Sequence, residues 1–135
     1  MTLGEKQELF MQLLPRLIDK AHELGFKIRG GDLFRDPRLH GHVGFQTVAW
    51  YATSIFPSLK RLFEMKNYRG YGFYKSCHKY KLAIDLNLMK NGLLIGTTEG
   101  HRELGEWWEE QGEFCRWGGR FNDGNHYSLT HNGSN

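Results

Sequence analysis

Apolar residues in the first part of the chain recur every three or four positions, which places them on one face of an α-helix. Thr2 and Glu5 have the spacing of a capping box before this stripe, and Gly25 is a typical stop after it. We therefore predict an amphipathic helix between these signals, with its apolar face in the core. The residues of that face are Leu9, Phe10, Leu13, Leu14, Leu17, Ile18, Ala21 and Leu24.

Residues 82–88 (LAIDLNL) alternate apolar and polar side chains, which is the period of a β-strand. The alternation sends the leucines and the isoleucine to one face of the strand and Asp85 to the other. Asn91-Gly92 is a strong hairpin signal, so residues 93–95 are predicted to form the returning strand.

Shorter signals complete the predicted fold. The further elements are strands at 26–29 and 127–129, helices at 48–65 and 102–111, loops at 32–47 and 66–75, and a frayed tail at 131–135. The chain has 135 residues and no internal repeat or linker, so we predict one domain, residues 1–135. Its class is α+β, with a small antiparallel sheet flanked by helices.

Composition argues against several classes of protein. The 18 basic and 15 acidic residues give a net charge of +3 without a basic block, which argues against a dedicated nucleic-acid binder. No apolar run reaches the roughly 18–20 residues of a membrane span, and the first ten residues lack the pattern of a signal peptide. Two cysteines cannot build a disulfide scaffold. We expect a soluble protein made in the cytoplasm.

The candidate chemistry lies in two pairs of histidine and aspartate. Asp85 stands in an otherwise apolar strand, where a lone carboxylate is costly to bury, and His78 precedes it. Later in the chain Asp123 comes three residues before His126. Two imidazoles and one carboxylate are the protein ligands of a catalytic Zn²⁺, and a further carboxylate is needed to take a proton from water. The four residues match this set.

The spacing of these residues resembles the motifs of a known family. Residues 76–85 (SCHKYKLAID) are similar to the S-x-H-x-x-G-x-A-x-D motif of the LAS-type (M15) zinc peptidases. Residues 123–126 (DGNH) are similar to the second motif of that family, a catalytic acid followed by the last zinc ligand. The segments 105–108 and 117–121 resemble the small phage-endolysin branch, whose members cut L-alanyl-D-glutamate bonds. The family also contains D-Ala-D-Ala carboxypeptidases and dipeptidases.

The resemblance implies a fold like that of Hedgehog and the D,D-peptidases, and it implies roles for individual residues. The zinc ligands that it implies are His78, Asp85 and His126. Asp123 would be the general base that activates water and returns the proton to the leaving amine. Arg35 would stabilise the oxyanion or hold a substrate carboxylate, and Ser76 would form a hydrogen bond near the site.

Two positions depart from the family pattern. Lys81 stands where the family has a glycine, and it would strain the turn by roughly 1 kcal/mol if the backbone there needs a positive φ. Asp36 follows Arg35 where a hydroxyl residue is more usual. Neither change removes a ligand.

The resemblance implies zinc-dependent hydrolysis of peptidoglycan, with the L-Ala–D-Glu bond favoured by the endolysin branch. The alternatives are a D,D- or L,D-carboxypeptidase of the same family and, in another class, a non-catalytic cell-wall-binding or virion module. We expect a monomer that acts on bacterial peptidoglycan, without nucleic acid or membrane insertion. A phage product that reaches the wall after release and a cytoplasmic recycling enzyme both fit the lack of a signal peptide.

The other histidines and the cysteines have simpler expectations. His40 and His42 lie in a loop without a nearby carboxylate, so a groove or solvent role is favoured over a second metal site. His101 is expected to cap or pack against the helix that follows. Cys77 and Cys115 are expected to be small core residues, and His22 and His131 to lie on the surface. The aromatic loop at 67–74 is interpreted as a wall of the substrate groove, and a surface for stacking nucleic-acid bases is the alternative.

Overall fold

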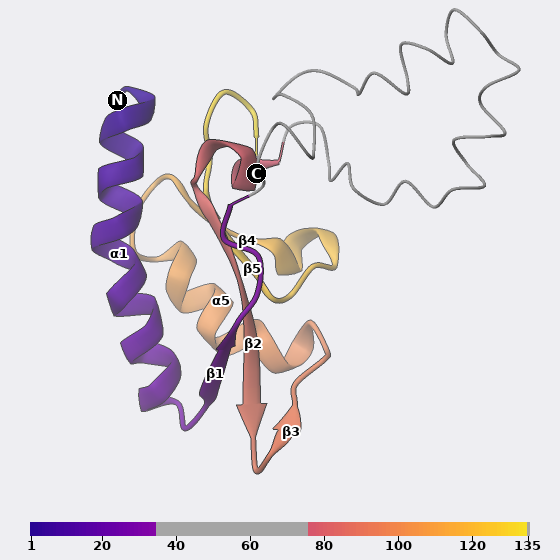
Figure 1. The fold of residues 1–135 in the computed structure, drawn as a ribbon. Helices are drawn as coiled ribbons and strands as arrows, with labels where there is room; N and C mark the ends of the chain where they lie inside the picture. The colour runs from indigo at the N-terminus through magenta and orange to yellow at the C-terminus, as the bar shows by residue number, and fades with distance from the viewer. Residues whose placement is uncertain (35–75, 135) are drawn as a thin grey trace, which may run out of the picture.

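Two helices and a five-stranded antiparallel sheet make up the part of the chain that the computed structural model describes, residues 1–34 and 76–134 (Figure 1). The helices α1 (Leu3–Glu23) and α5 (Arg102–Glu109) contact each other and share one apolar core with the sheet. This arrangement confirms the predicted α+β class. The loop and helix expected within residues 35–75 lie outside the described residues.

Helix α1 begins at the predicted capping box. The Thr2 N–H donates to the Glu5 carboxylate at 2.6 Å, and the Glu5 N–H donates to the Thr2 hydroxyl at 3.3 Å. The helix continues through Pro15, and Gly25 follows it with φ of +86°. Its apolar face is buried as expected, with Phe10, Leu17 and others in the core.

The sheet has the strand order β1-β2-β5-β4, and β3 pairs with β2. The strands are β1 (Lys27–Gly30), β2 (Ala83–Lys90), β3 (Leu93–Leu94), β4 (Cys115–Trp117) and β5 (His126–Leu129). Asn91 and Gly92 both have positive φ, at 52° and 77°, which confirms the predicted hairpin turn between β2 and β3. The long strand β2 lies inside the sheet, between β1 and β5.

The two faces of β2 have different surroundings. Its leucines and Ile84 belong to the core cluster that also contains residues of α1 and α5. Asp85 and Asn87 alternate onto the opposite face and are partly exposed. The helices therefore cover one face of the sheet, and Asp85 projects from the other.

The sequence analysis missed one strand and misjudged the tail. Residues 115–117 form β4, which pairs with β5, although the sequence there shows only aromatic stubs between glycine turns. The expectation of a frayed tail is wrong up to Ser134: a bridge joins His131 to Ser134, and Ser134 is 1% exposed. Positive φ at Asn132 and Gly133 closes this turn.

The expectations for the two cysteines and for His101 are confirmed. Cys77 and Cys115 are free thiols in the core. His101 is a packing histidine, buried and bonded through both ring nitrogens, and it makes no side-chain cap. None of the helices among the described residues has the length and apolar character that a bilayer crossing requires.

Candidate metal centre

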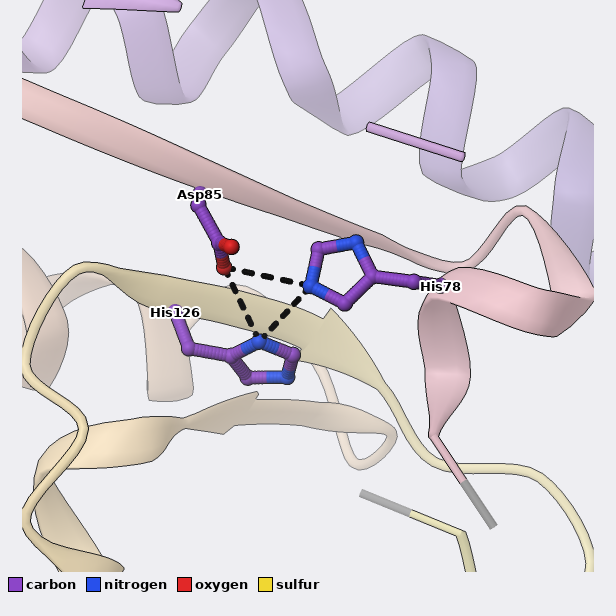
Figure 2. Close-up of side chains that lie close together, drawn as sticks. All are labelled: His78, Asp85 and His126. Atoms are coloured by element: carbon purple, nitrogen blue, oxygen red, sulfur yellow. Dashed lines mark hydrogen bonds and ion pairs between the residues drawn. The ribbon is translucent and has the colours of Figure 1, made fainter. Parts of the chain in front are cut away.

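Three side chains from separate segments converge on the face of the sheet opposite to the helices (Figure 2). His78 Nε2 lies 3.1 Å from Asp85 Oδ1 and 3.1 Å from His126 Nδ1. His126 Nδ1 lies 3.2 Å from the same Asp85 oxygen. The two histidines are buried and Asp85 is partly exposed, so the cluster opens to solvent on the carboxylate side.

Strand register brings two of these residues together. Asp85 on β2 is the direct partner of His126 on β5. Directly opposite residues of an antiparallel pair have Cβ atoms roughly 4.5–5.5 Å apart on the same face of the sheet. The alternation that predicts Asp85 on the polar face of β2 therefore also places it beside His126.

His78 reaches the other two from a turn just before β2. It lies in a 3₁₀ helix, Cys77–Tyr80, whose N-cap is Ser76; the His78 N–H donates to the Ser76 hydroxyl at 3.3 Å. Lys81 ends this helix in the left-handed region, with φ of 59°. The family glycine that Lys81 replaces thus corresponds to a position that does require positive φ.

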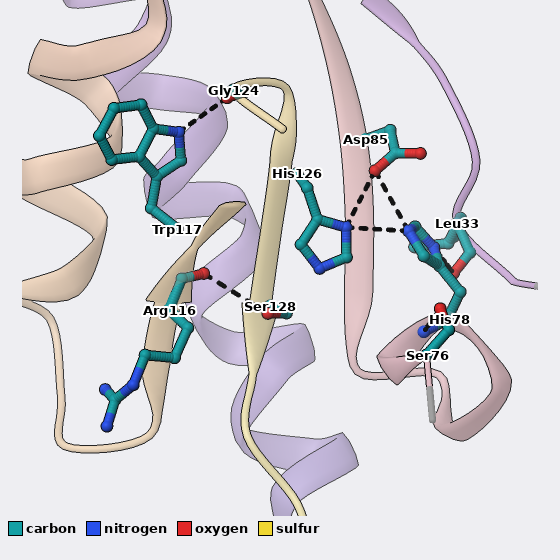
Figure 3. Close-up of polar contacts among 9 residues, drawn as sticks. All are labelled: Leu33, Ser76, His78, Asp85, Arg116, Trp117, Gly124, His126 and Ser128. Carbon is teal, nitrogen blue, oxygen red and sulfur yellow. Dashed lines mark hydrogen bonds and ion pairs between the residues drawn. The ribbon is translucent and has the colours of Figure 1, made fainter. Parts of the chain in front are cut away.

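A backbone carbonyl orients the His78 ring. His78 Nδ1 lies 3.3 Å from the Leu33 carbonyl oxygen, so Nδ1 carries the proton and donates to it (Figure 3). That tautomer leaves the lone pair of Nε2 directed at Asp85 and His126. Such a hydrogen bond on the far nitrogen is the usual support for a metal-binding histidine.

The loop before β5 is held by Trp117. Its indole N–H donates to the Gly124 carbonyl at 2.7 Å, two residues before His126 (Figure 3). A Cβ added at Gly118 would lie 2.7 Å from the Cβ of His126, too close for any other residue. The tryptophan and the glycine after it therefore fix where His126 enters the sheet.

The two histidines also set the charge of Asp85. Partial burial opposes ionisation of the carboxyl, but the His126 and His78 rings beside Asp85 Oδ1 outweigh this effect and lower its pKa. The carboxylate is therefore ionised at neutral pH and presents an anionic oxygen to the two ring nitrogens.

The cluster fits a tetrahedral metal ion. Ligands bound at 2.0–2.1 Å in a tetrahedron lie roughly 3.3–3.4 Å from one another, and the three atoms here are 3.1–3.2 Å apart. His126 Nε2 is buried and has no hydrogen-bond partner among the described residues. An unpaired buried N–H costs about 1–3 kcal/mol, which a bond from Nδ1 to a cation would offset. Two imidazoles and one carboxylate leave a fourth position open, as catalytic zinc sites do.

Asp123 lies close to the cluster in the chain and outside its ligand set. Its N–H donates to the Gly118 carbonyl at 2.9 Å, and its carbonyl accepts from the His126 N–H at 3.1 Å. Its side chain is exposed, and the group of possible ligands among the described residues does not include it. Asp123 is therefore fixed next to His126 by its backbone, and its carboxylate is outside the group of possible ligands.

The remaining candidates divide between the described and the undescribed residues. Ser76 is buried at the site and touches His78 only through the backbone N–H, so it supports the turn. Arg35, Asp36, His40, His42 and the 67–74 loop lie outside the described residues. The sequence analysis missed the Leu33 carbonyl and the loop contact of Trp117, because neither carries a motif of its own.

A family model matches the segment that holds this site. Residues 70–129 match the model of a peptidase M15 family, described as D-alanyl-D-alanine carboxypeptidase. The match supports an M15-family peptidase. It spans less than half of the chain but includes His78, Asp85, Asp123 and His126. No curated protein and no solved structure gives a significant match.

The segment that matches the peptidase family contains the three side chains of the cluster. M15 peptidases are zinc-dependent, and the matched segment contains the described group of side chains that could hold a metal ion. The match itself ends at the last residue of β5, so both strands of the site lie within it.

Proposed function

We propose that the protein is a zinc-dependent peptidase of bacterial peptidoglycan. The observation that carries this proposal is the His78–Asp85–His126 cluster, with three ligand atoms 3.1–3.2 Å apart inside the segment that matches the M15 family. The zinc ligands are these three residues. Asp123, three residues before His126, is the general base.

The residues of the chain have distinct tasks in hydrolysis. When bound, zinc polarises the scissile carbonyl and lowers the pKa of water. Asp123 accepts a proton from the water whose oxygen attacks the carbonyl carbon, and it passes that proton to the amine as the C–N bond breaks. Asp85 keeps its negative charge beside the histidines, and the Leu33 carbonyl keeps His78 Nε2 free for the metal. Arg35 is proposed to stabilise the oxyanion or to hold a substrate carboxylate.

The bond that we favour is L-Ala–D-Glu of the stem peptide, which makes the protein an endolysin. This choice is supported by the similarity of residues 105–108 and 117–121 to the phage branch of the family. In the structure the second segment forms part of β4 and the turn that carries Trp117 and Gly118. The description of the matching family favours the alternative, a carboxypeptidase that removes a terminal D-Ala.

Digestion of purified peptidoglycan tests the activity and separates the two bonds. The zinc-loaded protein is expected to lower the turbidity of cell walls and to release peptides that begin with D-Glu, identified by mass. Release of free D-Ala would identify the carboxypeptidase instead. The protein is proposed to act as a monomer after it leaves the cytoplasm in which it is made.

A substitution of Asp123 tests the base. Asp123→Asn is expected to retain zinc and to lower turnover on the order of 10²–10⁴-fold, since it removes only the proton acceptor. Asp19→Asn is the matched control, because Asp19 is an exposed carboxylate on α1 and should leave both properties unchanged. His126→Ala is expected to lose zinc and turnover together. If the wild type holds zinc and releases no peptide, the non-catalytic wall-binding or virion module replaces this proposal.

A further inference from the structure

Two cations of β1 lie on the same face of the sheet as the metal centre. Lys27 pairs with Met89 and Arg29 pairs with Asn87 of β2. Directly paired residues lie on the same face of a sheet. Asn87 and Met89 are two and four residues from Asp85 in the strand, so they lie on the same face as Asp85. Lys27 and Arg29 are exposed, whereas Ile28 between them packs against the core.

Arg29 is the β1 side chain that lies nearest to Asp85 on this face. Asn87, its direct partner, is two residues from Asp85, and such diagonal neighbours lie roughly 7–8 Å apart, within reach of a long side chain. Gly31 follows the last residue of β1 toward the site, and its N–H donates to the Asp85 carbonyl. A Cβ at Gly31 would lie 2.9 Å from that carbonyl oxygen, so this position suits only glycine and places no side chain of its own between Arg29 and Asp85.

Within the described residues, these two cations have no acidic partner of the kind that several other cations have. Other cations do form ion pairs: Lys20 with Glu23 at 3.1 Å, Arg102 with Glu99 at 2.7 Å and Arg120 with Glu109 at 2.6 Å. Within residues 1–34 and 76–134, no carboxylate forms an ion pair with Lys27 or Arg29. Among the described carboxylates none occupies the Arg29 guanidinium, which leaves it able to bind an anion from outside.

The surface around the two cations is hollowed and has no acidic residue in its lining. A hollow of about 500 Å³ is bounded by Lys27, Arg29, Met89 and the Asn91–Gly92 turn. A second hollow, of about 210 Å³, lies beside Asn87 and Asn125, and its lining contains amides, hydroxyls and no Lys, Arg, Asp or Glu. Of the described residues that line these two hollows, the lysine and arginine side chains are those of β1.

We propose that Arg29 binds a carboxylate of the substrate, with Lys27 adding to the positive field. This inference rests on the proposed function and names the substrate group that the site recognises. In both candidate bonds the residue whose amine leaves carries a free carboxylate: the α-carboxylate of γ-linked D-Glu, or the terminal carboxylate of D-Ala. A guanidinium holds a carboxylate through two parallel hydrogen bonds, which an ammonium does not.

A pair of substrates that differ only in this carboxylate tests the proposal. We would compare a stem peptide with D-Glu after L-Ala and the same peptide with D-isoglutamine, whose α-carboxyl is an amide. If the protein proves to be a carboxypeptidase, the two substrates compared are a peptide that ends in D-Ala and the same peptide with its terminal carboxyl converted to an amide. Binding of both peptides is measured by calorimetry beside turnover.

Three variants make the test specific to Arg29. Arg29→Gln is expected to lower kcat/KM for the acid on the order of tenfold, mainly through KM, and to leave the amide unchanged. For the acid substrate, Arg29→Lys should have a kcat/KM between that of the wild type and that of Arg29→Gln. Lysine keeps the positive charge and loses the paired hydrogen bonds. Arg16→Gln is the matched control, because Arg16 is an exposed arginine on α1 whose side chain donates to Gln111 at 2.7 Å.

The outcomes separate failure of the inference from failure of the proposed function. Equal losses on acid and amide in Arg29→Gln, or no loss on either, overturn the role of Arg29 and leave the peptidase intact. The same loss in Arg16→Gln would assign the effect to overall charge and also overturn it. A wild type that neither binds nor cuts either peptide overturns the proposed function, and the inference fails with it.

Discussion

At the scale of single residues, Lys81 shows how a side chain can tolerate a backbone conformation that suits glycine. It ends the 3₁₀ helix of His78 with φ of 59° and ψ of 36°. Its ammonium lies 5.1 Å from the centre of the Phe34 ring, a cation–π contact that keeps the side chain close to the segment carrying Leu33. The site therefore uses a strained turn to direct His78.

We predict that Lys81→Gly stabilises the protein. Glycine removes the left-handed penalty of about 1 kcal/mol, while its greater freedom in the unfolded chain takes back part of that gain. Lys81→Ala is the control, because alanine removes the ammonium and keeps the strain. Urea unfolding should give a higher unfolding free energy for the glycine variant than for the alanine variant. Equal values would show that the turn carries no strain.

At the scale of elements, Trp117 connects helix α5 to the loop of the metal centre. Cβ atoms added at Gly105 of α5 and at Gly119 would both collide with its indole ring. The same indole bonds to the Gly124 carbonyl before β5. Packing of α5 against Trp117 thus contributes to the position of His126, although α5 has no residue in the cluster.

Two alanine substitutions within helices should have opposite effects. Alanine is favoured over glycine in a helix by about 0.5–1 kcal/mol, and a Cβ at Gly4 in α1 meets nothing, so Gly4→Ala should stabilise. Gly105→Ala should instead destabilise by about 1–3 kcal/mol, since the indole must move. Thermal unfolding with and without zinc measures both. A stabilising Gly105→Ala would contradict the close packing described here.

His101 joins η4, the 3₁₀ helix Glu99–His101, to β5 through hydrogen bonds that require a neutral ring. Its Nε2–H donates to the Ile95 carbonyl at 3.2 Å, and its Nδ1 accepts from the Tyr127 hydroxyl at 2.9 Å. Burial lowers the pKa of His101, and the Ile95 hydrogen bond and the charge of Asp123 offset only part of this effect. Protonation would remove the acceptor that the Tyr127 hydroxyl uses.

The depressed pKa of His101 predicts a loss of stability in acid. The unfolded chain binds its proton near pH 6.5, the ordinary value, and the folded chain does so only at lower pH. Stability from this residue is therefore complete above about pH 6.5 and is lost as the pH falls further. In metal-free protein, the unfolding free energy should decrease more steeply below about pH 6.5 for the wild type than for His101→Gln. Parallel curves would contradict this role.

The elements that local signals encode were predicted, and those made by distant contacts were not. The capping box of α1 and the Asn91–Gly92 turn act over a few residues, so the sequence predicts them directly. Strand β4 has three residues and exists through its pairing with β5, which no local pattern reveals. Motif spacing indicated the cluster of His78, Asp85 and His126, but the Leu33 carbonyl lies 45 residues away from its partner His78 in the chain.

At the scale of the whole molecule, the metal is expected to stabilise the fold. It would join the turn before β2, β2 itself and β5, and a ligand that binds only the folded state at 100 times its Kd adds about 2.7 kcal/mol. Zinc should raise the Tm on the order of 10 °C and a chelator should reverse the shift. Asp85→Asn is the control, because it loses one ligand and should show no such shift. An unchanged Tm in the wild type with zinc would contradict metal binding at this cluster.

The order in which the ligands occur along the chain also has a consequence for synthesis. His126 follows His78 by 48 residues, so the ribosome makes it last of the three. At roughly 5–20 residues per second, the chain spends on the order of 2–10 s with an incomplete set of ligands. Strand β5 must also emerge from the ribosome and pair with β2 before Asp85 meets His126. A nascent chain is thus unable to assemble its metal centre, and the hydrolytic chemistry proposed for it would begin only once this last strand is in place.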